Sequence, residues 1–164
     1  GGTIVRRSIG RASLIALAQA ALVTLLVHAV SGADWMLLPA TLALTSVIAL
    51  AFTAVHAALT LTLGRAGLVV SLLLLAVQLV ATGGIVPIAA LADPFPALST
   101  VLPLSYAVDG MQALFAGGDP ARVWAAAAVM VLLGLISLAV ARLAAGRSRR
   151  RDALDAFAPA LVTA

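Results

Sequence analysis

The chain lacks cysteine, lysine, glutamate and asparagine entirely among its 164 residues. Without cysteine it can form no disulfide, no thiolate metal site and no cysteine nucleophile. Without lysine it has no Walker A motif, so we expect it not to bind and hydrolyse a nucleotide by itself. Catalytic patterns such as His-Glu-x-x-His and Gly-x-Ser-x-Gly are missing too, and no apolar run holds a pair of carboxylates. The sequence therefore predicts a protein that is not an enzyme.

Charge is scarce as well. Only 10% of the residues are charged and 63% are hydrophobic, with a mean hydropathy of +1.18. A soluble core of this size cannot hide so much apolar surface, so lipid must cover much of it. The pI of about 11.4 would suit nucleic acid, but the arginines sit at the ends of apolar runs without interleaved aromatics. We therefore expect the lipid bilayer as the anionic partner, no nucleic acid and no cofactor.

Four apolar runs are long enough to cross the hydrocarbon core, which takes about 20 residues. They are residues 12–30, 35–63, 66–88 and 120–143. A fifth apolar stretch, 93–118, is broken by prolines. The predicted fold is an all-α integral membrane protein with four transmembrane helices and an outer, proline-broken amphipathic hairpin, re-entrant in type, between the third and fourth. Residues 1–146 would form the membrane domain and 147–164 a basic cytoplasmic tail.

The arginines are distributed unequally between the two sides of this arrangement. With four spans both termini share a side, and nine of the ten basic residues lie there: Arg6, Arg7, Arg11, Arg65, Arg142, Arg147, Arg149, Arg150 and Arg151. Arg122 alone lies opposite. Because basic residues near span ends stay cytoplasmic, we predict a multi-pass plasma-membrane protein with both termini in the cytoplasm. The chain opens with glycine and no methionine, and we expect it to be a piece of a longer protein.

A helix break is predicted in the third run, which carries Gly83, Gly84 and Pro87 within a few residues. Two glycines and a proline loosen a helix and remove a backbone hydrogen bond. Lipid cannot satisfy the freed backbone groups, so this region must face protein or a water-filled vestibule. Beyond it, Asp93 and Pro94 can start a short helix, which Pro103 interrupts.

The following segment, residues 105–116, is closed by Gly117-Gly118 and is too short to cross the bilayer. Its pattern is amphipathic. Leu104, Val108, Met111 and Phe115 share one helical face, whereas Ser105, Asp109 and Gln112 share another. We expect this polar stripe to face the vestibule, the apolar face to pack on the spans or the membrane interface, and Tyr106 to anchor at headgroup level.

Four polar residues fall within the spans: Gln19, His28, His56 and Gln78. Such groups are candidates for function, but His and Gln also join helices by hydrogen bonds, and both interpretations stay open. The two histidines differ in depth by roughly 15 Å on antiparallel helices, so we expect no shared metal. The carboxylates of Asp34, Asp93 and Asp119 are expected to cap helices on the outer side, and Asp109 is the exception within the polar stripe.

The order of these features resembles a known family. A third run ending in Gly83-Gly84-x-x-Pro87, the motif Leu102-Pro103-x-x-Tyr106-Ala107-Val108-Asp109-Gly110 and a last run ending in arginines are similar to the C-terminal part of the YhgE/Pip family, within the ABC-2 type transporter membrane-domain group. The general layout extends over residues 11–146. Members often carry an arginine two residues after the last glycine of the motif, where this chain has Gln112.

The resemblance implies that the chain supplies the last four of six spans of a permease. Such a permease pairs as a dimer or with another membrane domain, exports a substrate outward and is driven by a separate cytoplasmic ATPase subunit. The alternative is a cell-envelope scaffold or receptor, in which the helices anchor a large extracellular domain used for secretion or phage adsorption. An adjacent ATPase would favour export.

Overall fold

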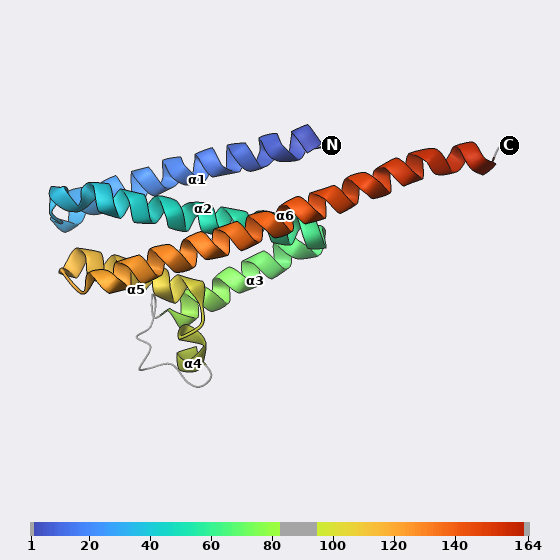
Figure 1. The fold of residues 1–164 in the computed structure, drawn as a ribbon. Helices are drawn as coiled ribbons and strands as arrows, with labels where there is room; N and C mark the ends of the chain where they lie inside the picture. The colour runs from blue at the N-terminus through green and yellow to red at the C-terminus, as the bar shows by residue number, and fades with distance from the viewer. Residues whose placement is uncertain (1, 83–94, 163–164) are drawn as a thin grey trace.

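The computed structural model describes residues 2–82 and 95–162, with side chains described over 7–82 and 96–147. Within these residues the chain forms helices and turns and no strand. The elements are α1 (Gly2–Ser31), the short 3-10 helix η1 (Trp35–Leu37), α2 (Leu38–Leu63), α3 (Arg65–Ala81), α4 (Phe95–Ser99), α5 (Pro103–Ala116) and α6 (Pro120–Val162) (Figure 1). The all-helical prediction is confirmed for this part of the chain.

The helix ends follow from local chemistry. Asp119 Oδ1 accepts a hydrogen bond from the Ala121 N–H at 2.9 Å, and Pro120 begins α6. Asp34 Oδ1 does the same for the Met36 N–H at the start of η1, so the capping role expected of both carboxylates is confirmed. Gly117 ends α5 in the left-handed conformation with φ +67°, and Gly64 turns the chain between α2 and α3 with φ +60°.

Among the described residues, three helical segments are long and apolar enough to cross a membrane: Arg7–Ser31, Trp35–Leu63 and Pro120–Arg147. They correspond to the first, second and fourth predicted spans. The helix of the third, α3, has 17 described residues and is about 25 Å long, less than the roughly 30 Å of a hydrocarbon core. Residues 83–88 of that predicted span lie outside the described residues. A complete crossing by the third predicted span, and with it the count of four spans, stays a prediction.

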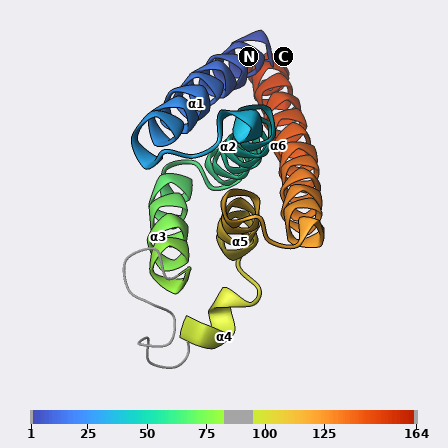
Figure 2. The ribbon, with the colours of Figure 1, turned by 90° about the vertical axis from the view of Figure 1, so that its left-hand side faces the viewer.

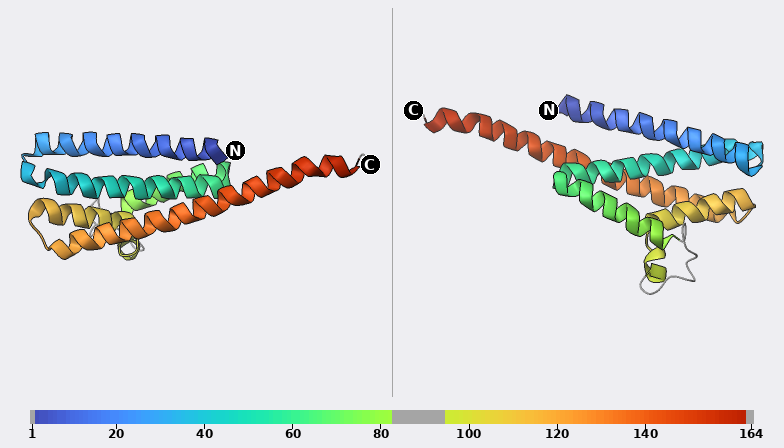
Figure 3. Two further views of the ribbon diagram at one scale, coloured as in Figure 1. Left: turned by 45° about the horizontal axis from the view of Figure 1, so that its top comes forward. Right: turned by 180° about the vertical axis from the view of Figure 1, so that it is seen from behind.

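Helix α2 occupies the middle of the bundle (Figure 2). It packs most extensively against α6 and α1, and also against α3 and α5. A core of Ala51, Ala107 and Met130 joins α2, α5 and α6. The basic C-terminal part of α6 continues as one helix past the ends of the other helices (Figure 3).

Small residues let the helix backbones approach closely. A Cβ added to Gly67 in α3 would collide with the backbone of Leu59 in α2. A Cβ added to Gly110 in α5 would collide with the Cβ of Ala126 in α6. Close approach at small residues is the usual way in which helices associate in lipid, because burying large apolar groups gives no advantage there.

Large apolar side chains point outward instead. Leu22, Leu72, Leu73 and Leu132 are each at least 60% exposed, and many others like them line the outer faces of α1, α3 and α6. The threonine hydroxyls of α2 donate to backbone carbonyls one turn earlier, as when Thr53 donates to the Ala49 carbonyl at 2.7 Å. Apolar exteriors with internally satisfied polar groups fit a helical bundle whose solvent is lipid.

Candidate functional site

Helix α5 lies between α3 and α6 (Figures 1 and 2). It forms hydrogen bonds with both helices. Gln78 of α3 is 1% exposed, and its Oε1 accepts a hydrogen bond from the Leu104 N–H at 3.1 Å. The first N–H groups of a helix have no partner within it, so Gln78 caps α5 from another helix. This intramembrane glutamine therefore joins two helices, which is the bonding role that the sequence left open beside a transport role.

The other side of α5 carries an ion pair. Asp109 Oδ2 accepts from Arg122 Nε at 2.8 Å, and Asp109 Oδ1 accepts a second bond from Nη2 of the same guanidinium. The side chains of Arg122 and Asp109 are 43% and 47% exposed. The hydrogen bonds from Arg122 hold the pKa of Asp109 below its usual value. Arg122 is the one arginine that the sequence predicts on the outer side, and its pairing with Asp109 ties α5 to the start of α6.

The most deeply buried residues of α5 are not the large apolar ones that mark its amphipathic pattern. The buried residues are the small ones, Ala107, Gly110 and Ala113, at 2% exposure for both alanines. The expected apolar face of Leu104, Val108, Met111 and Phe115 is only partly buried. An amphipathic pattern sorts large apolar from polar residues, whereas helix contact in lipid selects small ones, so Gly110 is a packing position against α6.

The members of the expected polar stripe fall in three different environments. Ser105 Oγ is buried without a hydrogen-bond partner among the described residues. Asp109 is paired and half exposed, and Gln112 is exposed. Tyr106 is 38% exposed, and its hydroxyl donates to the Thr100 carbonyl at 3.1 Å, which fixes the connection between α4 and α5. Pro103 starts α5, as the break predicted there requires.

The predicted helix break itself, Gly83, Gly84 and Pro87, lies outside the described residues, as does Asp93. The described part of α3 ends at Ala81, and the Thr82 N–H bonds to the Gln78 carbonyl at 3.0 Å. Gln78 thus stands in the last turn of the described helix, with its side chain directed to α5.

His28 is 1% exposed at the end of α1 that faces the α1–α2 connection. Its Nδ1 lies 3.0 Å from the Thr24 carbonyl and its Nε2 3.4 Å from Thr41 Oγ1 in α2. Because a carbonyl oxygen only accepts, Nδ1 carries a proton and donates it to the Thr24 carbonyl. Its ring also lies 5.7 Å from that of Trp35 and 5.5 Å from that of Phe115. His28 therefore links α1, α2 and α5.

The other two intramembrane polar residues differ from each other. His56 Nδ1 forms a hydrogen bond with Ser71 Oγ and so joins α2 to α3. Gln19 is exposed on α1. Within the described part of the chain no three His, Cys, Asp or Glu side chains are placed to hold a metal ion. Three of the four polar residues thus bond helices together.

Sequence reasoning missed the partners of these groups. Thr41, Ser71 and Arg122 complete the hydrogen bonds of His28, His56 and Asp109. Arg122 could have been found, because it is the lone arginine on its side and faces Asp109 across the short Gly117-Gly118 turn.

Long apolar helices, lipid-type packing and an outward apolar surface define a multi-pass helical membrane protein. Comparison with known proteins identifies the family. Residues 7–116 match the family model described as ABC-2 type transporter, and the chain belongs to this family. The match covers α1 to α5, so it includes the third predicted span and the helix that carries Asp109.

The resemblance to YhgE is confirmed as well. The chain is 30% identical over 96 residues to the uncharacterized protein YhgE of Bacillus subtilis (strain 168). The aligned region covers 58% of this chain and 12% of that protein, so the chain spans only a small part of the curated relative that it matches. No solved structure matches the chain.

Proposed function

We propose that this chain is the membrane-spanning part of an ABC-2 type exporter permease, which moves a substrate outward and takes its energy from a separate ATPase subunit. The observation that carries the proposal is the family match over α1 to α5, together with a short helix fixed between two bundle helices. Gln78 holds the first turn of α5 from α3, and Arg122 holds Asp109 from α6. A helix fastened to two neighbours would move with them, as the outer boundary of an alternating-access pathway must.

We further propose that residues 66–88 make a complete third crossing, so that the chain has four spans with both termini in the cytoplasm. The 17 described residues of α3 already cover about 25 Å, and the predicted span extends further, to residue 88. The strongly apolar outer surface of α3, with Leu72 and Leu73 at 68% and 61% exposure, supports contact with lipid or with a second membrane domain. A dimer, or a pair with another permease half in the plasma membrane, follows from the same proposal.

The proposed energy source can be tested directly. This chain has no lysine and so no Walker A motif, and the proposal assigns nucleotide hydrolysis to a separate subunit. The affinity-tagged protein, purified in mild detergent from its own membranes, should retain a subunit with a Walker A lysine, and the complex should hydrolyse ATP. Substitution of that lysine by alanine should abolish hydrolysis. Purification without an ATPase, at full yield of folded protein, would contradict the proposal and leave an anchoring role as the better explanation.

A further inference from the structure

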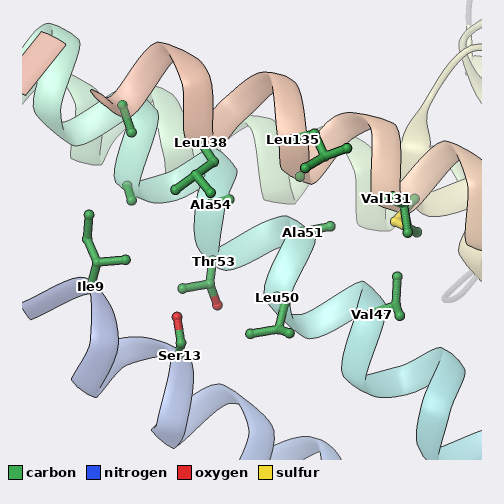
Figure 4. A pocket seen from close by; sticks show the side chains of 14 residues that line it. Ile9, Ser13, Val47, Leu50, Ala51, Thr53, Ala54, Val131, Leu135 and Leu138 are labelled. Carbon is green, nitrogen blue, oxygen red and sulfur yellow. The ribbon is translucent and has the colours of Figure 1, made fainter. Parts of the chain in front are cut away.

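A groove of about 340 Å³ runs along α2 between α1 and α6 (Figure 4). It forms because α1 and α6 both pack on α2 and contact each other little. Ile9 and Ser13 of α1, Leu50 and Ala54 of α2, and Leu135 and Leu138 of α6 line it. Short side chains such as Ala54 leave its floor open, and the walls are almost wholly apolar.

The groove extends over one half of the membrane thickness. Its lining on α2 runs from Val47 to Ala57 and on α6 from Met130 to Ala141. At 1.5 Å per residue each stretch is about 15 Å long, half of the roughly 30 Å hydrocarbon core. The end at Ala57 and Ala141 is the one next to Arg65 and Arg142. The groove therefore lies in the leaflet at the basic end of the molecule.

These dimensions favour a hydrocarbon chain over a helix. A helix with side chains is about 10 Å wide, so 15 Å of it occupies about 1,200 Å³, more than the roughly 850 Å³ of total empty space between the groove's walls. A volume of 340 Å³ lies instead within the roughly 300–1,000 Å³ of small-molecule sites. A single acyl chain is narrow and as long as one leaflet is thick.

Charge at the basic end supplies the second argument. Arg142 follows Leu138 by four residues and Leu135 by seven, so it shares the helical face of α6 that lines the groove. It is exposed, and no carboxylate pairs with it among the described side chains. Its guanidinium would lie at the depth where lipid phosphates begin, one turn beyond the apolar lining.

We propose that the groove is a binding site for an anionic glycerophospholipid, with one acyl chain lying between α1 and α6 and the phosphate paired with Arg142. Arg65 and Arg147 at the same end favour a lipid with net negative charge over a zwitterionic one. The bound chain would fill the space that α1 and α6 leave above α2. This inference holds whether or not the protein transports a substrate.

Native mass spectrometry of the purified protein tests the site. The protein is extracted from vesicles of equal parts phosphatidylglycerol and phosphatidylcholine, and the retained lipids are counted. We expect one phosphatidylglycerol to be retained by the wild type. Ala54→Trp, which fills the groove, should lower this occupancy at least about tenfold, since excluding even two methylenes from an apolar site has that effect. Arg142→Gln should keep a lipid but lose the preference for phosphatidylglycerol.

Ala76→Trp is the matched control, because Ala76 is exposed on α3 outside the groove. Equal retention by the Ala54 and Ala76 variants would overturn the proposal. If Ala54→Trp fails to fold, photolabelling of the wild-type protein tests the site without a variant. Phosphatidylglycerol with a diazirine in its acyl chain should label the groove residues Leu50, Leu135 and Leu138 more than Leu72 and Leu73 of α3. Even labelling, or no labelling of the groove because a protein segment fills it, would overturn the site.

Discussion

Two glutamines within the apolar helices show how neighbours decide the role of a residue. Gln78 is buried at 1% exposure and bonds to the first turn of α5, whereas Gln19 is exposed on the surface of α1. Both would be equally conspicuous in a hydropathy profile. Gln78 has a partner because α5 approaches α3. Substitution of the two glutamines therefore gives a matched test of the helix-joining role.

Gln78→Leu should lower the free energy of unfolding by about 1 kcal/mol. The substitution removes the acceptor of the Leu104 N–H, and a buried donor left without a partner costs about 1–3 kcal/mol, although helix-to-helix bonds in lipid average about 0.6. Gln19→Leu should change stability by less than about 0.5 kcal/mol. Unfolding by sodium dodecyl sulfate in mixed micelles measures both, and an equal or larger loss for Gln19→Leu would refute the assignment.

The pair of Asp109 and Arg122 predicts a dependence of stability on pH. Because the folded-state pKa of Asp109 is lowered from 3.8 through its hydrogen bonds with Arg122, its contribution is fully present above pH 3.8 and is lost as the pH falls through the lowered value. Asp109→Asn should therefore have a lower thermal midpoint than wild type at pH 7 and the same midpoint in strong acid. The difference should be small and should shrink with salt, since both side chains are about half exposed.

Asp34→Asn is the control for this measurement, because Asp34 caps η1 and forms no ion pair with any described side chain. Adding Arg122→Gln to the Asp109→Asn variant should lower the thermal midpoint little further, because the ion pair is already broken. A midpoint difference that persists unchanged at every pH would show that Asp109 acts through packing and not through its charge.

At the scale of elements, the contact between α5 and α6 depends on a single missing methyl group. Gly110→Ala would place a Cβ against the Cβ of Ala126 and 3.3 Å from the Arg122 carbonyl oxygen. Overpacking of this kind costs about 1–3 kcal/mol, and separation of the helices would also strain the bond between Asp109 and Arg122. Gly134→Ala in α6 meets its nearest atom at 3.4 Å, an ordinary contact. It should be neutral or stabilising, because alanine favours helix by about 1 kcal/mol over glycine.

Thermal denaturation of the two variants in one detergent compares them directly. We expect the thermal midpoint of Gly110→Ala to be lower than that of the wild type, and the midpoint of Gly134→Ala to be equal to it or higher. The reverse order would mean that α5 does not pack on α6 through Gly110.

The orientation of α5 can be read by cysteine labelling, for which a chain without cysteine is convenient. Substitutions at Tyr106 and Gln112, which are exposed, should react readily with a polar thiol reagent added from outside. Substitutions at Ala107 and Ala113, at 2% exposure, should react at least about tenfold more slowly. Position 105 should react slowly as well, since Ser105 Oγ is buried. Equal rates around the helix would contradict the packed position of α5.

Much of this arrangement was readable from sequence, and the exceptions share a cause. Helix ends depend on local chemistry, so the caps at Asp34 and Asp119 and the stop at Gly117 were predictable. Contacts between distant segments were not. The bond from Leu104 to Gln78 joins positions 26 apart, and the buried face of α5 follows from close approach, which selects small residues rather than the large apolar ones that mark a face in water.

At the scale of the whole molecule, charge and length together predict the topology. Nine of ten arginines lie in the N-terminal part of α1, at the turn from α2 to α3, or at the end of the apolar part of α6 and beyond it. An arginine at a helix centre in the membrane costs about 2.5–3.5 kcal/mol, and this penalty opposes the inverted orientation, in which these arginines would have to cross. Trp35 and Trp124 are exposed, by 56% and 75%, at the opposite end, as side chains in an interfacial aromatic belt would be.

The critical element for that topology is α3, whose described length is short of a full crossing. If it crosses, a reporter fused after Arg65 should be cytoplasmic and one fused after Gly118 should be on the outside, because the turn at Gly64 and the turn before Asp119 then lie on opposite faces of the membrane. Alkaline phosphatase and green fluorescent protein fusions at these two positions give opposite readouts for each side. A cytoplasmic reporter at both positions would mean that α3 enters the bilayer and returns, that α6 alone reverses the chain's side, and that the termini lie on opposite faces.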